Sequence, residues 1–173
     1  MLDTANAAGQ RFLISNLDAI HSSSPDVQGV LGTWFLLRFD FGFDLQSRTL
    51  TFTAPPPSSD SDGVRVEFHL VNLRPVVSSS LGDLELDSAS NQLILYGIRP
   101  DDVQSSYQLH TVAGFQVVGK SHDKQLAVAG KRVWRGDAVA MPNRPEAGID
   151  GLLPLNLFKS IYICNSGGYI IFR

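Results

Sequence analysis

Short runs of apolar and β-branched residues, separated by turn-forming residues, dominate the hydrophobic pattern of this chain. From Val64 to Leu70 the sequence VRVEFHL alternates between apolar and polar residues, as a strand with one buried face does. Three further runs are rich in β-branched and aromatic residues and are bounded by Gly, Ser, Asn or Pro: Gln92 to Tyr96, Phe115 to Val118 and Tyr169 to Phe172. Many short strands with turns between them predict an all-β sandwich or barrel.

Helical patterns and chain breaks are few. Two short segments suggest helices, Thr33 to Phe39 (TWFLLRF) and Leu155 to Ser160 (LNLFKS). The clearest break is APPPSSDSDG at 54–63, where three consecutive prolines cannot donate to a strand ladder and the Ser/Asp run has no apolar residue to bury. We interpret 54–63 as a linker or exposed loop, which divides the chain into 1–53 and 64–173.

An internal repeat spans this break. Gly29 to Phe52 (GVLGTWFLLRFDFGFDLQSRTLTF) and Gly151 to Phe172 (GLLPLNLFKSIYICNSGGYIIF) share one order of features. Each has a glycine, two aliphatic residues, a short amphipathic helix, an aromatic-rich strand, a polar turn and a strand that ends in Phe. The second copy is two residues shorter, and we place the difference at the turn, where 46–48 matches 166–168. Two unrelated strand–helix–strand units are the alternative, but the length of the match favours a duplication.

Composition excludes several classes of function. With 43% hydrophobic and 18% charged residues the chain is globular, and its net charge of −3 argues against binding to nucleic acid. No apolar stretch approaches the roughly 20 residues of a membrane span, and Met1 to Gln10 lacks the features of a signal peptide, so the sequence leaves localisation open. A single cysteine, Cys164, excludes an internal disulfide and a cysteine-based zinc cage. No metal is expected, because the four histidines are scattered: His21, His69, His110 and His122.

The segment LELDSASNQLILY, which begins at Leu84, carries the strongest candidate for chemistry. A strand-like run delivers Asp87 into a turn of small residues, 88–91, after which a second apolar strand leaves. Small residues let the backbone and a facing loop approach closely, and the hydroxyls and amides of the turn can hydrogen-bond to the carboxylate. Taken alone, an ordinary Asx turn between two strands explains the same residues.

The sequence around Asp87 resembles the catalytic loop of the retropepsin-like aspartic proteases, of the bacterial two-lobe type, with Ala89 at the position usually held by glycine. Lobes of that family close with two aliphatic residues and a glycine, followed by a short helix. Val30-Leu31-Gly32 resembles this closing segment, and Leu152-Leu153-Pro154 resembles it with proline in place of glycine. The spacing between the two motifs is similar to that of a one-lobe member and leaves room for a flap hairpin, for which Thr111 to Val118 is the candidate.

The resemblance implies an all-β, retropepsin-like fold. Residues 64–173 would form a complete, closed barrel-like catalytic lobe, and 1–53 would contain the closing half of a partial N-terminal lobe. Two short helices would begin near Thr33 and Leu155. It also implies an aspartic endopeptidase that acts on a peptide or protein substrate without metal or organic cofactor. A pair of aspartates would share one proton and activate a water molecule.

In this interpretation Asp87 is one catalytic aspartate, and Ser88 and Ala89 support the loop that carries it. Ser88 would contribute a hydroxyl that braces the loop. The alternative is a catalytically inactive module of the same fold, which binds peptides or takes part in assembly and in which Asp87 is structural.

The second aspartate has three candidate sources. Leu2-Asp3-Thr4-Ala5-Asn6 resembles the Asp87 loop, but Asp3 lies only 26 residues before Gly29, too few for the strands and flap of a whole lobe, and a frayed terminus is the alternative. A homodimer could supply Asp87 of a second copy. An N-terminal half-lobe missing from this chain is the third source. If that half-lobe is not filled, the closing half should expose an extended apolar patch: Phe35, Leu36, Phe39, Phe41 and Phe43.

Overall fold

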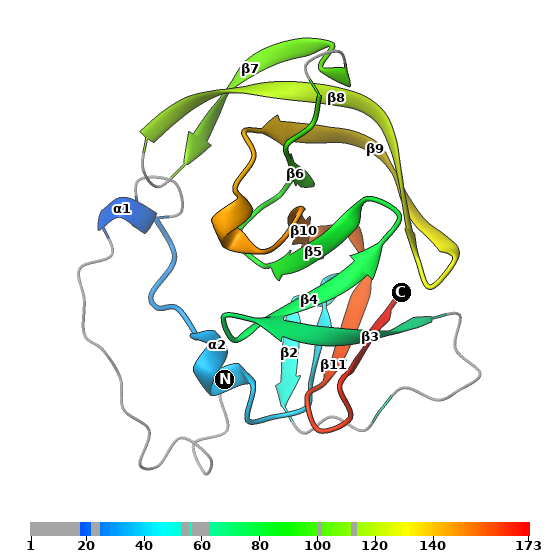
Figure 1. The fold of residues 1–173 in the computed structure, drawn as a ribbon. Coiled ribbons are helices and arrows are strands. Elements are labelled where there is room, and N and C mark those ends of the chain that lie inside the picture. Colours follow the sequence, from blue (N-terminus) through cyan, green and yellow to red (C-terminus); the bar gives the residue numbers. More distant parts are fainter. Residues whose placement is uncertain (1–17, 22–24, 53–55, 57–62, 100–101, 112–113) are drawn as a thin grey trace.

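The computed structural model describes residues 18–21, 25–52, 56, 63–99, 102–111 and 114–173. Strands make up most of these residues and form one large sheet, which confirms the predicted all-β class (Figure 1). The helices are short: α1 (Asp18–His21), α2 (Thr33–Leu36) and the 3-10 helices η3 (Pro145–Ala147) and η4 (Leu155–Leu157).

Two of these helices begin where the sequence predicts, at Thr33 and Leu155, but both end earlier than predicted. The residues after η4 join the strand ladder instead. The backbone N–H groups of Lys159 and Ser160 both donate to the C=O group of Arg173. Pairing with a distant strand therefore overrides the local helical pattern.

Twelve strands build the sheet within the described residues. In chain order they are β1 (Phe41–Asp44), β2 (Thr49–Phe52), β3 (Val64–Val71), β4 (Arg74–Ser79), β5 (Gly82–Asp87), β6 (Ile94–Tyr96), β7 (Ser105–Thr111), β8 (Gly114–Val128), β9 (Lys131–Met141), β10 (Gly151–Pro154), β11 (Ser160–Cys164) and β12 (Tyr169–Phe172). Their order across the sheet is β2-β1-β11-β12-β3-β4-β5-β10-β6-β9-β8-β7. Neighbouring strands are antiparallel except in two pairs, β5–β10 and β6–β9, which are parallel.

The sheet curls so that β8 returns to β4. Ser79 pairs with Val128, and the N–H of Ser80 donates to the C=O of Ala127 over 2.9 Å. β8 is 15 residues long, and register shifts in its pairing with β9 bend it over the molecule (Figure 1). The strands of this curl and the segments that join them contribute much of the main core, including Val77, Leu84, Leu93, Leu126, Val128, Ala138 and Leu153. The hairpin strands β1, β11 and β12 contribute the rest of its strand residues: Phe41, Ile161, Ile163, Ile170 and Phe172.

The two copies of the sequence repeat form two hairpins, β1–β2 and β11–β12. A four-residue turn joins the strands of each hairpin, 45–48 in the first and 165–168 in the second. The fourth turn residue has a positive φ in both, 55° at Arg48 and 68° at Gly168. A constant difference of 120 in residue number therefore relates the strands and turn of one hairpin to those of the other.

Pairing between β1 and β11 has a local two-fold symmetry. Gly42 pairs with its own equivalent, Tyr162, and the pairs on either side exchange equivalent residues, namely Phe41 with Ile163 and Phe43 with Ile161. The two halves of the repeat thus meet as two subunits of a symmetric dimer would. The geometry strengthens the interpretation of the repeat as a duplication.

The difference in length between the two copies lies between helix and strand, and our placement of it at the turn is wrong. Residues 37–40 separate α2 from β1, whereas 158–159 separate η4 from β11. The longer connection, 37–40, and the residue before it accept hydrogen bonds from the turn of the other hairpin, 165–168. Asn165 donates from Nδ2 to the C=O of Leu36 over 3.1 Å, and Ser166 donates to Asp40 from both its backbone N–H and its hydroxyl.

The apolar residues of the first copy do not form the extended exposed patch expected of an unfilled half-lobe. Phe41 is buried, with 3% of its surface exposed, and the other four are half-buried. The phenylalanine rings among them pack against one another and against Phe52, with centroid distances of 5.1 Å for Phe35–Phe39 and 5.3 Å for Phe39–Phe52. The large apolar residues that this part of the chain does expose are Val30 (67%) and Trp34 (74%).

Candidate active site

Asp87 is the last residue of β5, a strand held on both sides. β4 pairs with it antiparallel and β10 pairs with it parallel. Side chains alternate along β5, so fully buried Leu84 lies on one face while Asp83 and Glu85 share the other face with Asp87. The Asp87 side chain is half-buried at the point where the strand ends.

The turn after β5 holds the carboxylate of Asp87 through the backbone. The N–H of Ala89 donates to Oδ1 of Asp87 over 2.8 Å, which is the geometry of an Asx turn. Further along, the Ser90 hydroxyl donates to the C=O of Gln92 over 2.7 Å, and the N–H of Gln92 donates back to that hydroxyl over 3.2 Å. Ser90 therefore contributes a bracing hydroxyl that the sequence did not single out, whereas Ser88 and Ala89 are exposed.

The second closing segment, Leu152–Pro154, lies directly beside this turn. In β10, Leu153 pairs with Leu86, and Pro154 pairs with Asp87 itself. A proline at the end of the strand costs little, because the ladder needs no further N–H there. The helix η4 follows at once, and Asn156 donates from Nδ2 to the C=O of Asn91 over 3.4 Å, which ties it to the turn.

The first closing segment, Val30–Gly32, reaches the same region from the other copy of the repeat. Leu31 of this segment lines a pocket of about 110 Å³. Leu86 and Ser88, on either side of Asp87 in the sequence, line the same pocket. The structure thus brings together three segments that the sequence singled out separately: the Asp87 loop and both closing segments.

The face of β5 that carries Asp87 also carries an ion pair, two residues earlier at Glu85. Arg74 binds Glu85 with an Nη1–Oε1 distance of 2.8 Å. Burial raises the pKa of the Tyr96 phenol; the nearby Arg144 guanidinium opposes this, and the carboxylates of Glu85 and Asp87 add to it. The Tyr96 phenol therefore stays neutral over the whole physiological pH range, within electrostatic reach of the Asp87 carboxylate.

Comparison of the sequence with known proteins assigns it to no family. The sequence matches no protein-family model, and no curated protein matches it.

Within the described residues, no three His, Cys, Asp or Glu side chains cluster in a way that could hold a metal ion. None of the described helices is long and apolar enough to cross a membrane.

The flap candidate, Thr111–Val118, runs from the last residue of β7 into the first part of β8. Thr111 pairs with Gly114, and residues 112–113 lie outside the described residues. Asp3, the candidate partner of Asp87, also lies outside them.

A second pocket, of about 290 Å³, lies between the β7–β8 hairpin and the loop after Asp87. Tyr107 donates from its hydroxyl to Oε1 of Gln92, while Lys120 binds Asp137 with an Nζ–Oδ2 distance of 2.9 Å. Sequence analysis missed these four residues, because they come from separate strands and the loop and share no local pattern.

Proposed function

We propose that this chain is part of an aspartic endopeptidase of the retropepsin-like type, with Asp87 as one of its two catalytic aspartates. One observation carries the proposal: Asp87 stands at the carboxyl end of β5, fixed by the Ala89 amide and flanked by the parallel strand of its own closing segment. An ordinary Asx turn between two strands needs no third strand beside its aspartate. Here β10, from far along the chain, lies parallel to β5 beside Asp87.

The shape of the sheet supports the closed-lobe part of the proposal. The contact between β8 and β4 connects the strands β4, β5, β10, β6, β9 and β8 in a ring, and the main core extends from this ring to β1, β11 and β12. The local two-fold axis at Gly42 and Tyr162 supports a two-lobe origin, because it relates the closing hairpins of a complete and a partial lobe.

The proposed mechanism uses a carboxylate pair and water. Two aspartates close enough to share one proton cannot both ionise, so one takes a proton from water while the other donates to the scissile carbonyl. The Ala89 amide holds Oδ1 of Asp87, and in this mechanism Oδ2 is the oxygen that meets the water. Because the pair titrates as a unit, its two apparent pKa values belong to the dyad. Asp3, Asp87 of a second copy and a further N-terminal segment are the candidate sources of the other aspartate.

The decisive experiment is cleavage of an unfolded protein at acidic pH by the parent chain, Asp87→Asn and Asp83→Asn. Asparagine keeps an oxygen that can accept the Ala89 N–H, so the turn survives while the general base is lost. We expect Asp87→Asn to lower the rate about 100-fold or more. A transition-state-mimicking inhibitor of aspartic proteases should abolish the parent activity.

Asp83 is the matched control, because it lies on the same face of β5 and its carboxylate accepts a hydrogen bond from the Ser78 hydroxyl over 2.7 Å. Asp83→Asn should cleave like the parent. Equal cleavage by the parent and Asp87→Asn would remove Asp87 from the mechanism.

The Asx turn itself favours a second candidate function, an inactive peptide-binding or assembly module in which Asp87 only shapes the loop. That module would show no inhibitor-sensitive cleavage. It would also keep its stability in Asp87→Asn, since the amide preserves the turn, and lose stability in Asp87→Ala, which removes the acceptor for the Ala89 amide.

A further inference from the structure

The pocket of about 290 Å³ beside the β7–β8 hairpin has a polar lining that the proposed mechanism does not use. Ser105 of β7 pairs with Lys120 of β8, so their side chains lie on one face of the sheet. Tyr107, two residues after Ser105, lies on that same face. β9 and the loop after Asp87 complete the lining, which consists of Gln92, Ser105, Tyr107, Lys120, Asp137 and Ala138.

A second apolar cluster connects this pocket to Asp87. Its buried members are Ile94, Val118 and Val139. Tyr96 and Tyr107 both pack against it, and burial raises the pKa of the Tyr96 phenol while the nearby Asp87 carboxylate adds to this effect. Gln92 follows Asp87 by five residues, which span at most about 18 Å. A peptide bound at Asp87 can therefore place a side chain in the pocket from within about five residues of the reacting bond.

The carboxylate in the pocket is already occupied by partners from this chain. Oδ2 of Asp137 lies 2.9 Å from Nζ of Lys120. Oδ1 lies 3.0 Å from Nδ1 of His122 and accepts the N–H of Asp123 over 3.3 Å. Both oxygens of Asp137 are thus engaged, so the pocket has little to offer a cationic ligand.

The hydrogen-bond donors of the pocket, in contrast, are only partly used. Among the described residues the Lys120 ammonium binds one partner, Asp137, although it has three protons to donate. Gln92 accepts the Tyr107 hydroxyl through Oε1, and this leaves its Nε2 as a donor. The Ser105 hydroxyl has no partner in the described part of the chain. An ammonium, an amide and a hydroxyl in one pocket suit a carboxylate, which accepts several hydrogen bonds at once.

We propose that this pocket binds the carboxylate side chain of an acidic residue in the peptide substrate, with Lys120 as the residue that determines the specificity. Asp137 holds the ammonium at the pocket wall, and the side chains of this ion pair are each 39% exposed, so an incoming carboxylate can reach it. The methylene groups of the acidic side chain would contact the apolar cluster. The role in substrate selection rests on the proposed function, whereas binding alone needs no hydrolysis.

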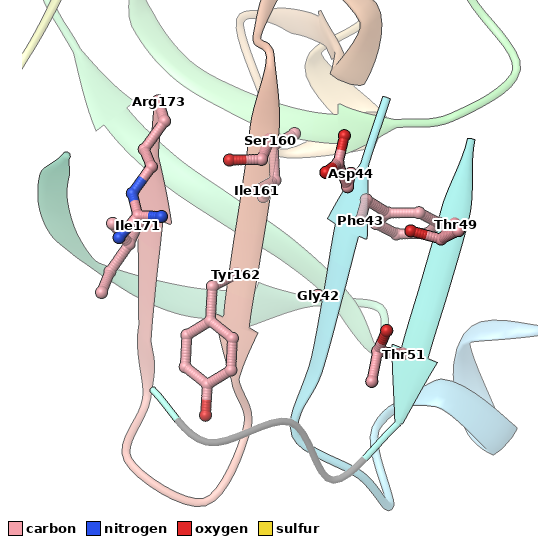
Figure 2. A pocket seen from close by; sticks show the side chains of 10 residues that line it. All are labelled: Gly42, Phe43, Asp44, Thr49, Thr51, Ser160, Ile161, Tyr162, Ile171 and Arg173. Carbon is pink, nitrogen blue, oxygen red and sulfur yellow. The ribbon is translucent and has the colours of Figure 1, made fainter. Parts of the chain in front are cut away.

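Another pocket with a cationic residue provides an internal comparison. Its volume is about 260 Å³, and it lies on the central strands β1, β2, β11 and β12, with Thr51 and Tyr162 among its lining residues and Arg173 as its cation (Figure 2). The carboxylate in this pocket, Asp44, accepts the N–H groups of its own turn. Because these strands do not include β5, Arg173 should have no part in a preference exerted beside Asp87.

The test uses blocked ten-residue peptides with a central Phe-Phe pair in a Ser/Ala host, in which each host position in turn carries Glu or Gln. Binding to the full chain with Asp87→Asn, which prevents cleavage, is measured by NMR titration at about pH 5, where a Glu side chain is mostly ionised. At one position the Glu peptide should bind about tenfold more tightly than the Gln peptide and shift the side-chain amide signals of Gln92. Lys120→Gln should bring this ratio close to one, and Lys120→Arg, which keeps the charge, should retain most of it.

Arg173→Gln is the matched control and should leave the ratio unchanged. If Lys120→Gln fails to fold, the salt dependence replaces it: the ratio should fall as the salt concentration rises from about 50 mM to about 500 mM. Four results would overturn the proposal: no position that prefers Glu, a ratio that salt does not change, loss of the ratio in Arg173→Gln, or acetate that binds as tightly as the Glu peptides and so reveals a simple anion site.

Failure of this inference can be told apart from failure of the proposed function. Cleavage by the parent chain without any preference for Glu would reject the acidic subsite and leave the aspartic endopeptidase in place. A Glu preference in binding, lost in Lys120→Gln, without cleavage of any of the peptides by the parent chain would support the subsite and count against the endopeptidase.

Discussion

Single aspartates hold several strand connections of this molecule in place. Asp44 accepts the N–H groups of Gln46 and Ser47 and so closes the first hairpin turn, and these hydrogen bonds lower its pKa. At Asp40, burial would raise the pKa, but the hydrogen bonds from Ser166 and its neighbours outweigh it and lower the pKa. The lowered pKa values mean that each carboxylate binds its loop more strongly in its charged form.

Asp137 gives the clearest prediction at this scale. Hydrogen bonds from Lys120 and His122 lower its pKa from 3.8 to about 2. A carboxylate whose pKa is lower in the folded state stabilises the fold above pH 3.8, and this contribution is lost as the pH falls towards 2. Asp137→Asn should therefore melt below the parent at pH 6, and the difference should shrink between pH 4 and pH 2.

Thermal unfolding of both proteins by circular dichroism across this range is the measurement. A difference in melting temperature that stays constant down to pH 2 would contradict the electrostatic explanation and indicate a packing effect.

Individual site residues were predictable from sequence to different degrees. Asp87 could be found because its context is local: a strand followed by small turn residues. Ser90 lies in the same turn, but nothing in the sequence shows which of two serines directs its hydroxyl at the Gln92 backbone. Asn156 and the Lys120–Asp137 pair act across the sheet, so their roles depend on strand pairing that no local pattern encodes.

The elements around the candidate site differ in how tightly they are packed. Gly151 opens β10 between β5 and β6, and a Cβ added there would collide with the backbone oxygen of Ile94 and lie 3.0 Å from Cδ2 of Leu84. Backbone cannot move aside as a flexible side chain can. Gly151→Ala should therefore destabilise the protein by about 1 to 3 kcal/mol, as measured by urea unfolding.

Gly29, the counterpart of Gly151 in the sequence repeat, offers a matched control, because an added Cβ there meets nothing within 4 Å. Gly29→Ala should change the unfolding free energy by less than about 0.5 kcal/mol. Equal effects of the two substitutions would mean that the two copies are packed alike, contrary to the structure.

Strand prediction succeeded where side-chain chemistry is locally distinctive. Val64–Val71 alternates, and Tyr169–Phe172 is β-branched and aromatic throughout; both are strands with nearly the predicted limits. The long strand Gly114–Val128 was predicted only in its first part, because its middle, GKSHDKQ, has neither alternation nor β-branched residues. Pairing with β9 holds most of that middle in the sheet, apart from a bulge at His122 and Asp123, where Asp123 has a φ of 55°; this is a tertiary effect.

At the scale of the whole molecule, the two copies of the repeat are unequal partners. Their hairpins meet on a local two-fold axis, yet only the second copy has an aspartate loop paired with its closing strand in the described residues. In the proposed mechanism one lobe cannot act alone, since the shared proton requires two carboxylates. In this mechanism the second carboxylate must come from outside the described lobe.

Activity and assembly should therefore be linked in the isolated chain. Val30 begins the first closing segment and Trp34 follows it by two residues; the two side chains are 67% and 74% exposed and could contact a second chain. We expect the purified chain either to sediment as a species larger than the monomer or to be inactive. Any cleavage of unfolded protein should follow the larger species across a sedimentation velocity profile, and Trp34→Ser should shift the profile towards the monomer. An active, compact monomer would contradict this prediction and would make Asp3 the partner of Asp87.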